Sequence, residues 1–154
     1  LWKSVPYDTY WSADSYPLSY KIREKTSNII LMRLADILLL KAEALVELDR
    51  TPEAIRIVNG IRERAGFAPS SLDENMGQAR GRLAVENERQ LELYMEGQRW
   101  FDLVRNNRLL EVMQKHKEKD GRLLFAGLQA FRQLWPIPQG EKDKNTNLTQ
   151  NEGY

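Results

Sequence analysis

Two neighbouring stretches decide the fold: ILMRLADILLLKAEALVEL at residues 30–48 and TPEAIRIVNGIRERAG at residues 51–66. In the first stretch apolar residues recur at three- and four-residue steps, which is the period of an α-helix. The predicted inward stripe consists of Leu31, Leu34, Leu38, Ala42, Leu45 and Leu48, broadened by Ile30, Ile37 and Ala44. Because this helix, expected over residues 29–48, is apolar around much of its circumference, we expect it to lie between other elements.

The second stretch predicts another helix directly after the first. Thr51 is the expected N-cap residue, Pro52 takes the first helical position, and Glu53 places an acid in the first turn. Its predicted buried residues are Ala54, Ile57, Val58, Ile61 and Ala65, and Gly66 suits a left-handed helix end.

The two helices together have tetratricopeptide-like spacing. Ala42 and Ala54 are small enough for two antiparallel helices to approach closely, while larger residues fill the gaps. One such hairpin cannot bury both of its faces, so it needs further elements to pack against it.

The rest of the chain predicts shorter helices with irregular connections. A helix over residues 80–95 should turn Leu83, Leu91, Tyr94 and Met95 inward, and a short helix over 98–105 should bury Trp100, Phe101 and Val104. These two helices are candidates for a second, degenerate hairpin. A further helix is expected over residues 109–117, whereas Pro136 and Pro138 exclude one through 134–138, and residues 140–154 read as extended coil. The predicted fold class is all-α, with an aromatic-rich loop segment at 1–28 and a helical domain at 29–154.

Composition excludes several functional classes. The 23 Lys and Arg residues nearly balance the 22 Asp and Glu residues, which argues against a nucleic-acid partner. Without cysteine there is no disulfide framework, thiolate metal site or cysteine nucleophile, and a single histidine, His116, cannot build a histidine-rich metal centre. We therefore predict no metal and no cofactor. The apolar stretch 29–48 contains Arg33, Asp36 and Lys41, which a lipid-facing span would not tolerate.

Five blocks of sequence, in order, resemble the SusD/RagB family. They are ILMRLADILLLKAEAL at 30–45, NGIRERAG at 59–66, NERQLELYMEGQRWFDLVR at 87–105, LWPIP at 134–138 and NTNLTQNEGY at 145–154. The departures are small: Leu34 replaces a common aromatic residue, and Thr146 and Glu152 replace the usual prolines of the ending.

The resemblance carries implications for function. It places these residues in the carboxyl-terminal part of a longer protein, whose amino-terminal part would carry a lipid anchor. Such proteins are outer-membrane lipoproteins on the cell surface of Bacteroidetes-type bacteria. They bind glycans, or sometimes peptides, and cover a SusC-like TonB-dependent transporter. The resemblance thus implies non-catalytic nutrient capture, with the membrane reached only through the lipid anchor.

One set of charged residues is open to two interpretations. It comprises Glu88, Arg89, Glu92, Glu96, Arg99, Asp102 and Arg105. Paired carboxylates are what a glycosidase uses, but Glu and Arg at three- and four-residue steps also form ion pairs on and between helices. We favour ion pairs because no nucleophile or orienting group accompanies the acids. Arg33 and Glu43 are each expected to meet a neighbouring helix.

The aromatic segment holds the candidate ligand site. Trp2, Tyr7, Tyr10 and Trp11 offer flat rings for the apolar faces of sugars. The alternative is that these rings pack onto the helical core and pin a long loop. No catalytic or metal-binding residue is predicted. The competing function is a tetratricopeptide-like scaffold for a protein or peptide partner.

Overall fold

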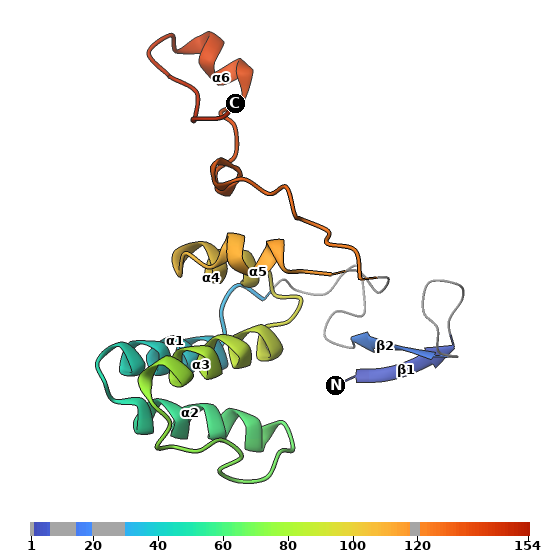
Figure 1. Cartoon of the computed structure of the whole chain (residues 1–154), viewed down its shortest axis with the longest axis vertical. Helices are drawn as coiled ribbons and strands as arrows, with labels where there is room; N and C mark the ends of the chain where they lie inside the picture. Colours follow the sequence, from blue (N-terminus) through green and yellow to red (C-terminus); the bar gives the residue numbers. More distant parts are fainter. Residues whose placement is uncertain (1, 7–14, 20–29, 118–120) are drawn as a thin grey trace. The chain divides into compact units, whose positions relative to one another are not determined.

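The computed structural model describes residues 2–6, 15–19, 30–117 and 121–154. The chain divides into two compact units, residues 1–98 and 99–154, and each is described by itself. The first unit contains a β-hairpin and three packed helices, and the second contains short helices joined by irregular segments (Figure 1).

The first unit opens with a two-stranded antiparallel hairpin, β1 (Trp2–Pro6) and β2 (Ser15–Ser19). Trp2 lies opposite Ser19 and Pro6 opposite Ser15. Both strands are edge strands, where proline is tolerated because its missing N–H is not required by a second neighbour. The sequence predicted loop or short extended pieces here but not their pairing. With this hairpin added, the helical fold class is confirmed.

Three helices form the core of the first unit: α1 (Leu34–Glu47), α2 (Thr51–Arg64) and α3 (Gln78–Glu92) (Figure 1). All three pairs of helices are in contact. The core that they share consists of Leu39, Ala42, Leu45, Val46, Ala54, Val58, Ile61 and Val85. Ala42 and Ala54 are fully buried, so the predicted close-packed hairpin of α1 and α2 is confirmed, and α3 supplies the partner that it needs.

The start of α2 corrects one prediction. Arg50, not Thr51, is the N-cap residue, and Thr51 is the first residue of the helix. Thr51 is buried, and its methyl group lies so close to Gly81 of α3 that a Cβ on Gly81 would come within 2.7 Å of it. The side chain therefore packs against α3 instead of capping α2. Pro52 still fits the first turn, where its missing N–H costs nothing.

The end of α2 is as predicted. Gly66 has a φ of 98°, and the N–H groups of Gly66 and Phe67 donate to the carbonyl oxygens of Glu63 and Arg62. This pair of hydrogen bonds, with glycine at positive φ, is the helix terminus that the sequence predicts.

The inward face of α1 differs from the prediction. The helix begins at Leu34, and the residues before it that the structure describes are non-helical. Leu31, Leu34, Ile37 and Leu48 are exposed, and the buried residues are Ala35, Asp36, Leu39, Ala42, Leu45 and Val46. A helix that is apolar on nearly all sides does not specify its inward face by period alone.

The inward face of α3 was also predicted wrongly. Leu83, Leu91, Tyr94 and Met95 are exposed, whereas Gly81, Val85, Glu88 and Arg89 are buried. Gly81 allows close approach to α2, and Glu88 and Arg89 are turned inward by ionic partners on the other two helices. The helix ends at Glu92, and a turn with positive φ at Met95 and Gly97 follows.

The second unit contains α4 (Arg99–Arg105), α5 (Leu109–Gln114), a 3₁₀ turn η1 (Ala130–Gln133) and α6 (Gln139–Lys144). Trp100 and Phe101 were predicted to be core residues, but they are 37% and 66% exposed. Leu103 and Asp102 occupy the inward face of α4 instead. Asp102 forms an ion pair with Arg105 at 2.9 Å, which compensates in part for the burial of its charge.

The end of the chain holds the LWPIP segment by side-chain to main-chain hydrogen bonds. Gln150 bonds to both the N–H and the carbonyl of Ile137, at 2.8 and 3.0 Å. Asn151 donates to the Trp135 carbonyl, and the Tyr154 hydroxyl donates to the Leu134 carbonyl. The segment is non-helical, as the prolines require, but α6 interrupts the region that was predicted to be extended coil throughout. No helix within the described ranges is long and apolar enough to cross a bilayer.

Candidate functional site

Charged residues from three of the sequence blocks meet inside the first unit. Block 30–45 supplies Arg33 and Asp36, block 59–66 supplies Arg62 and Arg64, and the rest come from block 87–105: Glu88, Arg89, Glu92 and Glu96. We call these eight residues the ion-pair network. Its members come from segments far apart in the chain, so it forms only when α1, α2 and α3 pack together.

The most deeply buried pair joins α3 to α1. Arg89 and Asp36 approach to 2.9 Å, and their side chains are only 3% and 8% exposed. The Arg89 guanidinium also donates to the Asp36 carbonyl oxygen. Removing either member of such a buried pair is strongly destabilising, because the remaining charge loses a close counter-ion.

Arg33 bonds to two acids of the network at once. Its Nε donates to both carboxylate oxygens of Glu96, at 2.9 and 3.1 Å, and its two terminal nitrogens reach the carboxylate and the main-chain carbonyl of Glu92. The hydrogen bond to Glu96 is the main reason why the pKa of Arg33 is raised above its ordinary value. The prediction that Arg33 meets a neighbouring helix is confirmed, and that for Glu43 stays a prediction.

The remaining acids of the network are also held by arginines. Arg62 lies 3.0 Å from Glu88, and Arg64 contacts the same Glu92 carboxylate that Arg33 does. Ion pairing of Glu88, Glu92 and Glu96 is therefore confirmed.

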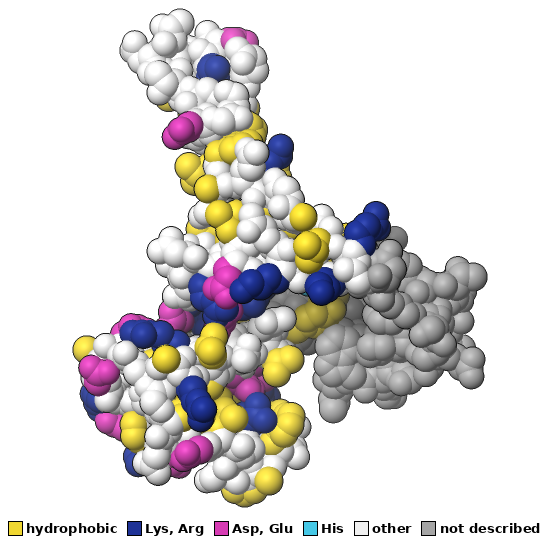
Figure 2. All heavy atoms as spheres, in the orientation of Figure 1, with side chains coloured by type: hydrophobic (Ala, Val, Ile, Leu, Met, Phe, Trp, Pro, Cys, Tyr) yellow, Lys and Arg dark blue, Asp and Glu magenta, His cyan; other side chains and the backbone are white. Residues whose placement is uncertain are grey.

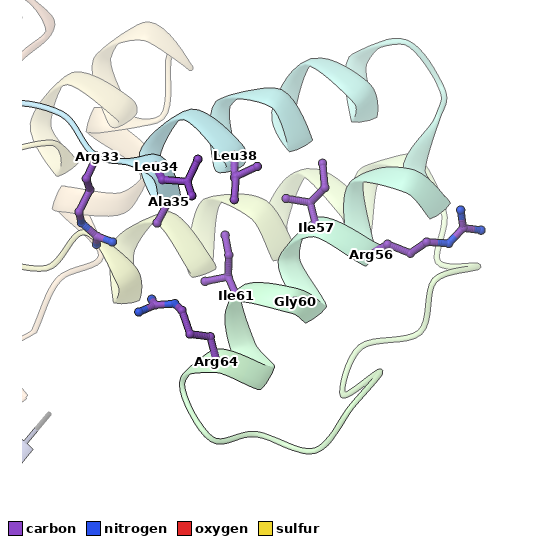
Figure 3. A pocket seen from close by; sticks show the side chains of 9 residues that line it. All are labelled: Arg33, Leu34, Ala35, Leu38, Arg56, Ile57, Gly60, Ile61 and Arg64. Carbon is purple, nitrogen blue, oxygen red and sulfur yellow. The ribbon is translucent and has the colours of Figure 1, made fainter.

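A hollow lies between α1 and α2, on the side of α1 that was expected to face the core. It has a volume of about 470 Å³. Its lining is apolar at Leu34, Ala35, Leu38, Ile57 and Ile61, with Gly60 between them. Figure 3 places Arg33 and Arg64 at one end and Arg56 at the other. We call this hollow the α1–α2 groove.

The arginines of the groove already have acidic partners. Arg56 lies 2.8 Å from Glu74, and Arg33 and Arg64 both contact Glu92. The groove thus presents an apolar floor with neutralised ends. Sequence reasoning missed it because Leu34 and Leu38 were assigned to a stripe packed against other elements.

The surface of the described residues mixes both charge signs. On the face shown in Figure 2, Lys and Arg side chains alternate with Asp and Glu side chains and with hydrophobic groups over the three-helix unit. His116 is exposed just beyond the end of α5, with its ring centroid 6.2 Å from that of Phe125. In the part of the chain that the structure describes, no three side chains of His, Asp or Glu are grouped to hold a metal ion.

Most of the aromatic residues that were predicted to bind a ligand lie outside the residues that the structure describes. Tyr7, Tyr10 and Trp11 fall outside the described residues. Trp2 is the first residue of β1, and only its backbone is described. The assignment of these four rings to a ligand site therefore stays a prediction.

The fold is that of a helical protein of the tetratricopeptide-like type. The charged residues of the ion-pair network bind one another across its helices. The model of the SusD family matches residues 5–154, and the chain belongs to this family. The resemblance seen in five sequence blocks is thereby confirmed.

Relatives and solved structures agree with this assignment. A SusD-like protein of Formosa agariphila is 40% identical over 83% of the chain and 25% of its own length. The starch-binding protein SusD of Bacteroides thetaiotaomicron is 28% identical over 94% of the chain and 24% of its own length. The crystal structure of a SusD homolog from the same species superposes with a TM-score of 0.63 at 29% identity, covering 80% of this chain and 26% of that one. The chain spans about a quarter of the length of these relatives.

Proposed function

We propose that this chain takes part in the non-catalytic binding of glycans at the outer surface of the cell. The observation that carries the proposal is membership of the SusD family over residues 5–154, together with similarity to a protein named for starch binding. The charge pattern supports it, because the acids that would suggest hydrolysis are engaged by arginines.

The aromatic segment is the proposed contact with sugar. A pyranose ring exposes C–H groups on its faces, and these pack on indole and phenol rings while the polar edge of the ring stays free for hydrogen bonds. Trp2, Tyr7, Tyr10 and Trp11 lie within ten residues of one another in sequence. In this proposal at least one of these rings is exposed at the rim of a shallow cleft.

Delivery is the second part of the proposal. A surface protein that captures a glycan needs a route for it through the outer membrane, and a SusC-like TonB-dependent transporter is the partner that the family resemblance implies. The membrane association proposed for the protein is through a lipid anchor outside these residues.

Isothermal titration calorimetry of the 154-residue chain against soluble polysaccharides tests the proposal, with amylopectin and maltooligosaccharides as first probes and other plant and algal glycans as a panel. The chain should bind at least one of them. Alanine at the responsible ring among the four should weaken binding by roughly 1–3 kcal/mol, the scale of one buried aromatic contact.

The chain offers a matched control. Trp135 is 83% exposed, so Trp135→Ala removes an exposed indole and leaves all four rings of the aromatic segment in the sequence. That variant should keep full affinity. Binding to no member of the panel would refute the function, and full affinity after substitution of all four rings would refute the site.

The α1–α2 groove favours a second candidate, a scaffold that binds a peptide. An apolar channel between antiparallel helices suits the apolar face of an amphipathic helix. Peptide binding that is lost on Leu38→Glu, with no glycan binding by the same chain, would favour this alternative. Glycan binding that survives the same substitution would favour the first.

A further inference from the structure

Arg33 lies where α3 ends, although it belongs to the segment that begins α1. Its backbone is extended, and its carbonyl oxygen accepts the N–H groups of Asp36 and Ile37 in the first turn of α1. Its side chain meanwhile bonds to Glu92, the last residue of α3, and to Glu96 in the following turn. One residue thus joins the start of one helix to the end of another.

The turn that receives Arg33 has an unfavourable backbone conformation. Met95 has a φ of 64° and Gly97 a φ of 77°. Glycine tolerates this left-handed region, but methionine does not favour it, because its Cβ crowds the following carbonyl. Such a conformation persists only where surrounding contacts impose it.

The contacts of Arg33 bracket that methionine. One terminal nitrogen donates to the main-chain carbonyl of Glu92, an end group of α3 that lacks a helical partner. The same terminal nitrogen also donates to one oxygen of the Glu96 carboxylate, and Nε donates to both of its oxygens. Arg33 therefore binds the backbone at Glu92 before Met95 and the side chain of Glu96 directly after it, through a planar guanidinium whose fork fixes direction as well as distance.

We propose that Arg33 is the positioning residue of the turn at residues 93–97. Its guanidinium holds Met95 in the left-handed conformation and so sets the path along which the chain leaves α3. It assigns a function to the arginine of block 30–45 and to two acids of block 87–105, Glu92 and Glu96.

Local hydrogen exchange tests the proposal with Arg33→Lys, which keeps the charge but loses the planar fork. Amides of residues 93–97 should exchange about tenfold faster, while amides in the middle of α1 and α2 should change little. The matched control is Arg56→Lys, which alters another groove arginine, the one paired with Glu74, and should leave the turn unchanged. An equal rise in exchange over all three helices, or none at 93–97, would overturn the proposal.

A rescue variant separates positioning from general stabilisation. Glycine adopts positive φ without a steric penalty, so Met95→Gly added to Arg33→Lys should restore most of the lost protection at the turn. If the double variant exchanges as fast as Arg33→Lys alone, Arg33 does not act by holding Met95, and the proposal fails. Should Arg33→Lys not fold, Glu96→Gln removes the other half of the contact and carries the same two expectations.

Discussion

At the scale of single residues, arginine is the side chain that organises the first unit. Four arginines from three sequence blocks engage four acids, and Glu92 serves two of them. The guanidinium suits this work because it stays charged and presents several donors in a fixed plane. These contacts explain why acids and arginines recur at set positions in the blocks.

The buried pair of Arg89 and Asp36 should be the most sensitive member of the network. Asp36→Asn removes the carboxylate charge that lies 2.9 Å from the buried Arg89 guanidinium, so the free energy of unfolding should fall by about 3–5 kcal/mol. Denaturant unfolding measures the loss. The control is Glu74→Gln, which breaks the more exposed pair with Arg56 and should cost less than about 1 kcal/mol. Equal losses in the two variants would contradict the ranking by burial.

A surface pair gives a prediction about pH. The Arg82 guanidinium bonds to Glu47 at 2.7 Å and holds the pKa of that carboxyl below its ordinary value of 4.5. The folded protein then binds this proton less tightly than the unfolded chain does, so the contribution of the pair to stability is present above pH 4.5 and lost as the pH falls through the lower pKa. In Arg82→Gln the NMR titration midpoint of Glu47 should rise toward 4.5. An unchanged midpoint would show that Arg82 is not the cause.

At the scale of elements, close helix approach is set by small residues. Ala42 and Ala54 bring α1 and α2 together, and Gly81 brings α3 against Thr51 and Val46. The alanines could be read from the sequence because they fall at tetratricopeptide-like spacing. Gly81 could not, because its role depends on the residues that it faces, which lie 30 and 35 positions earlier in the chain.

Substitutions at two helical glycines, Gly81 and Gly60, test the effects of packing and of helix propensity separately. A Cβ on Gly81 would lie 2.7 Å from the Thr51 methyl carbon, so Gly81→Ala should lower the free energy of unfolding by about 1–3 kcal/mol through overpacking. A Cβ on Gly60 would meet nothing within 4 Å, so Gly60→Ala should raise stability by up to about 1 kcal/mol. Thermal or denaturant unfolding of both variants measures the contrast. A stabilising Gly81→Ala would mean that α3 packs less closely than described.

The short helix α4 provides a second test of inward faces. Leu103 is 2% exposed, so Leu103→Ala should cost about 2–5 kcal/mol, whereas the more exposed Phe101→Ala should cost less than about 1 kcal/mol in this chain. Denaturant unfolding compares them. A larger loss for Phe101→Ala would restore the original prediction that the ring belongs to the core.

Helix positions followed from the sequence more reliably than helix faces. The break after residue 48, the glycine end at Gly66 and the turn at Gly97 all depend on local backbone chemistry, which neighbouring residues determine. The inward faces of α1 and α3 depend on partners elsewhere. The period of α1 offered more than one apolar side, and the acid at Asp36 turned inward because of an arginine 53 residues later.

At the scale of the whole molecule, some features of the candidate site could be predicted from the sequence and others could not. Ion pairing of the charged blocks was predictable as a class, because charges at helical spacing without a nucleophile point to structure. Which arginine meets which acid was not, since Arg33 and Glu96 are separated by 63 positions. The sugar-binding role of Trp2, Tyr7, Tyr10 and Trp11 depends on the exposure of rings and remains a proposal.

We propose that the charged blocks stabilise the three-helix unit and that glycan binding depends on other residues, and one titration tests this proposal most directly. Glu92→Gln weakens contacts of both Arg33 and Arg64 while keeping the size of the side chain. Calorimetry compares its affinity with that of the unaltered chain, for the glycan which that chain binds, at a temperature where both are folded. We expect Glu92→Gln to have a lower melting temperature than the unaltered chain. Its glycan affinity should stay within about threefold of the original, a difference of under 1 kcal/mol. An unchanged melting temperature with binding abolished would contradict it.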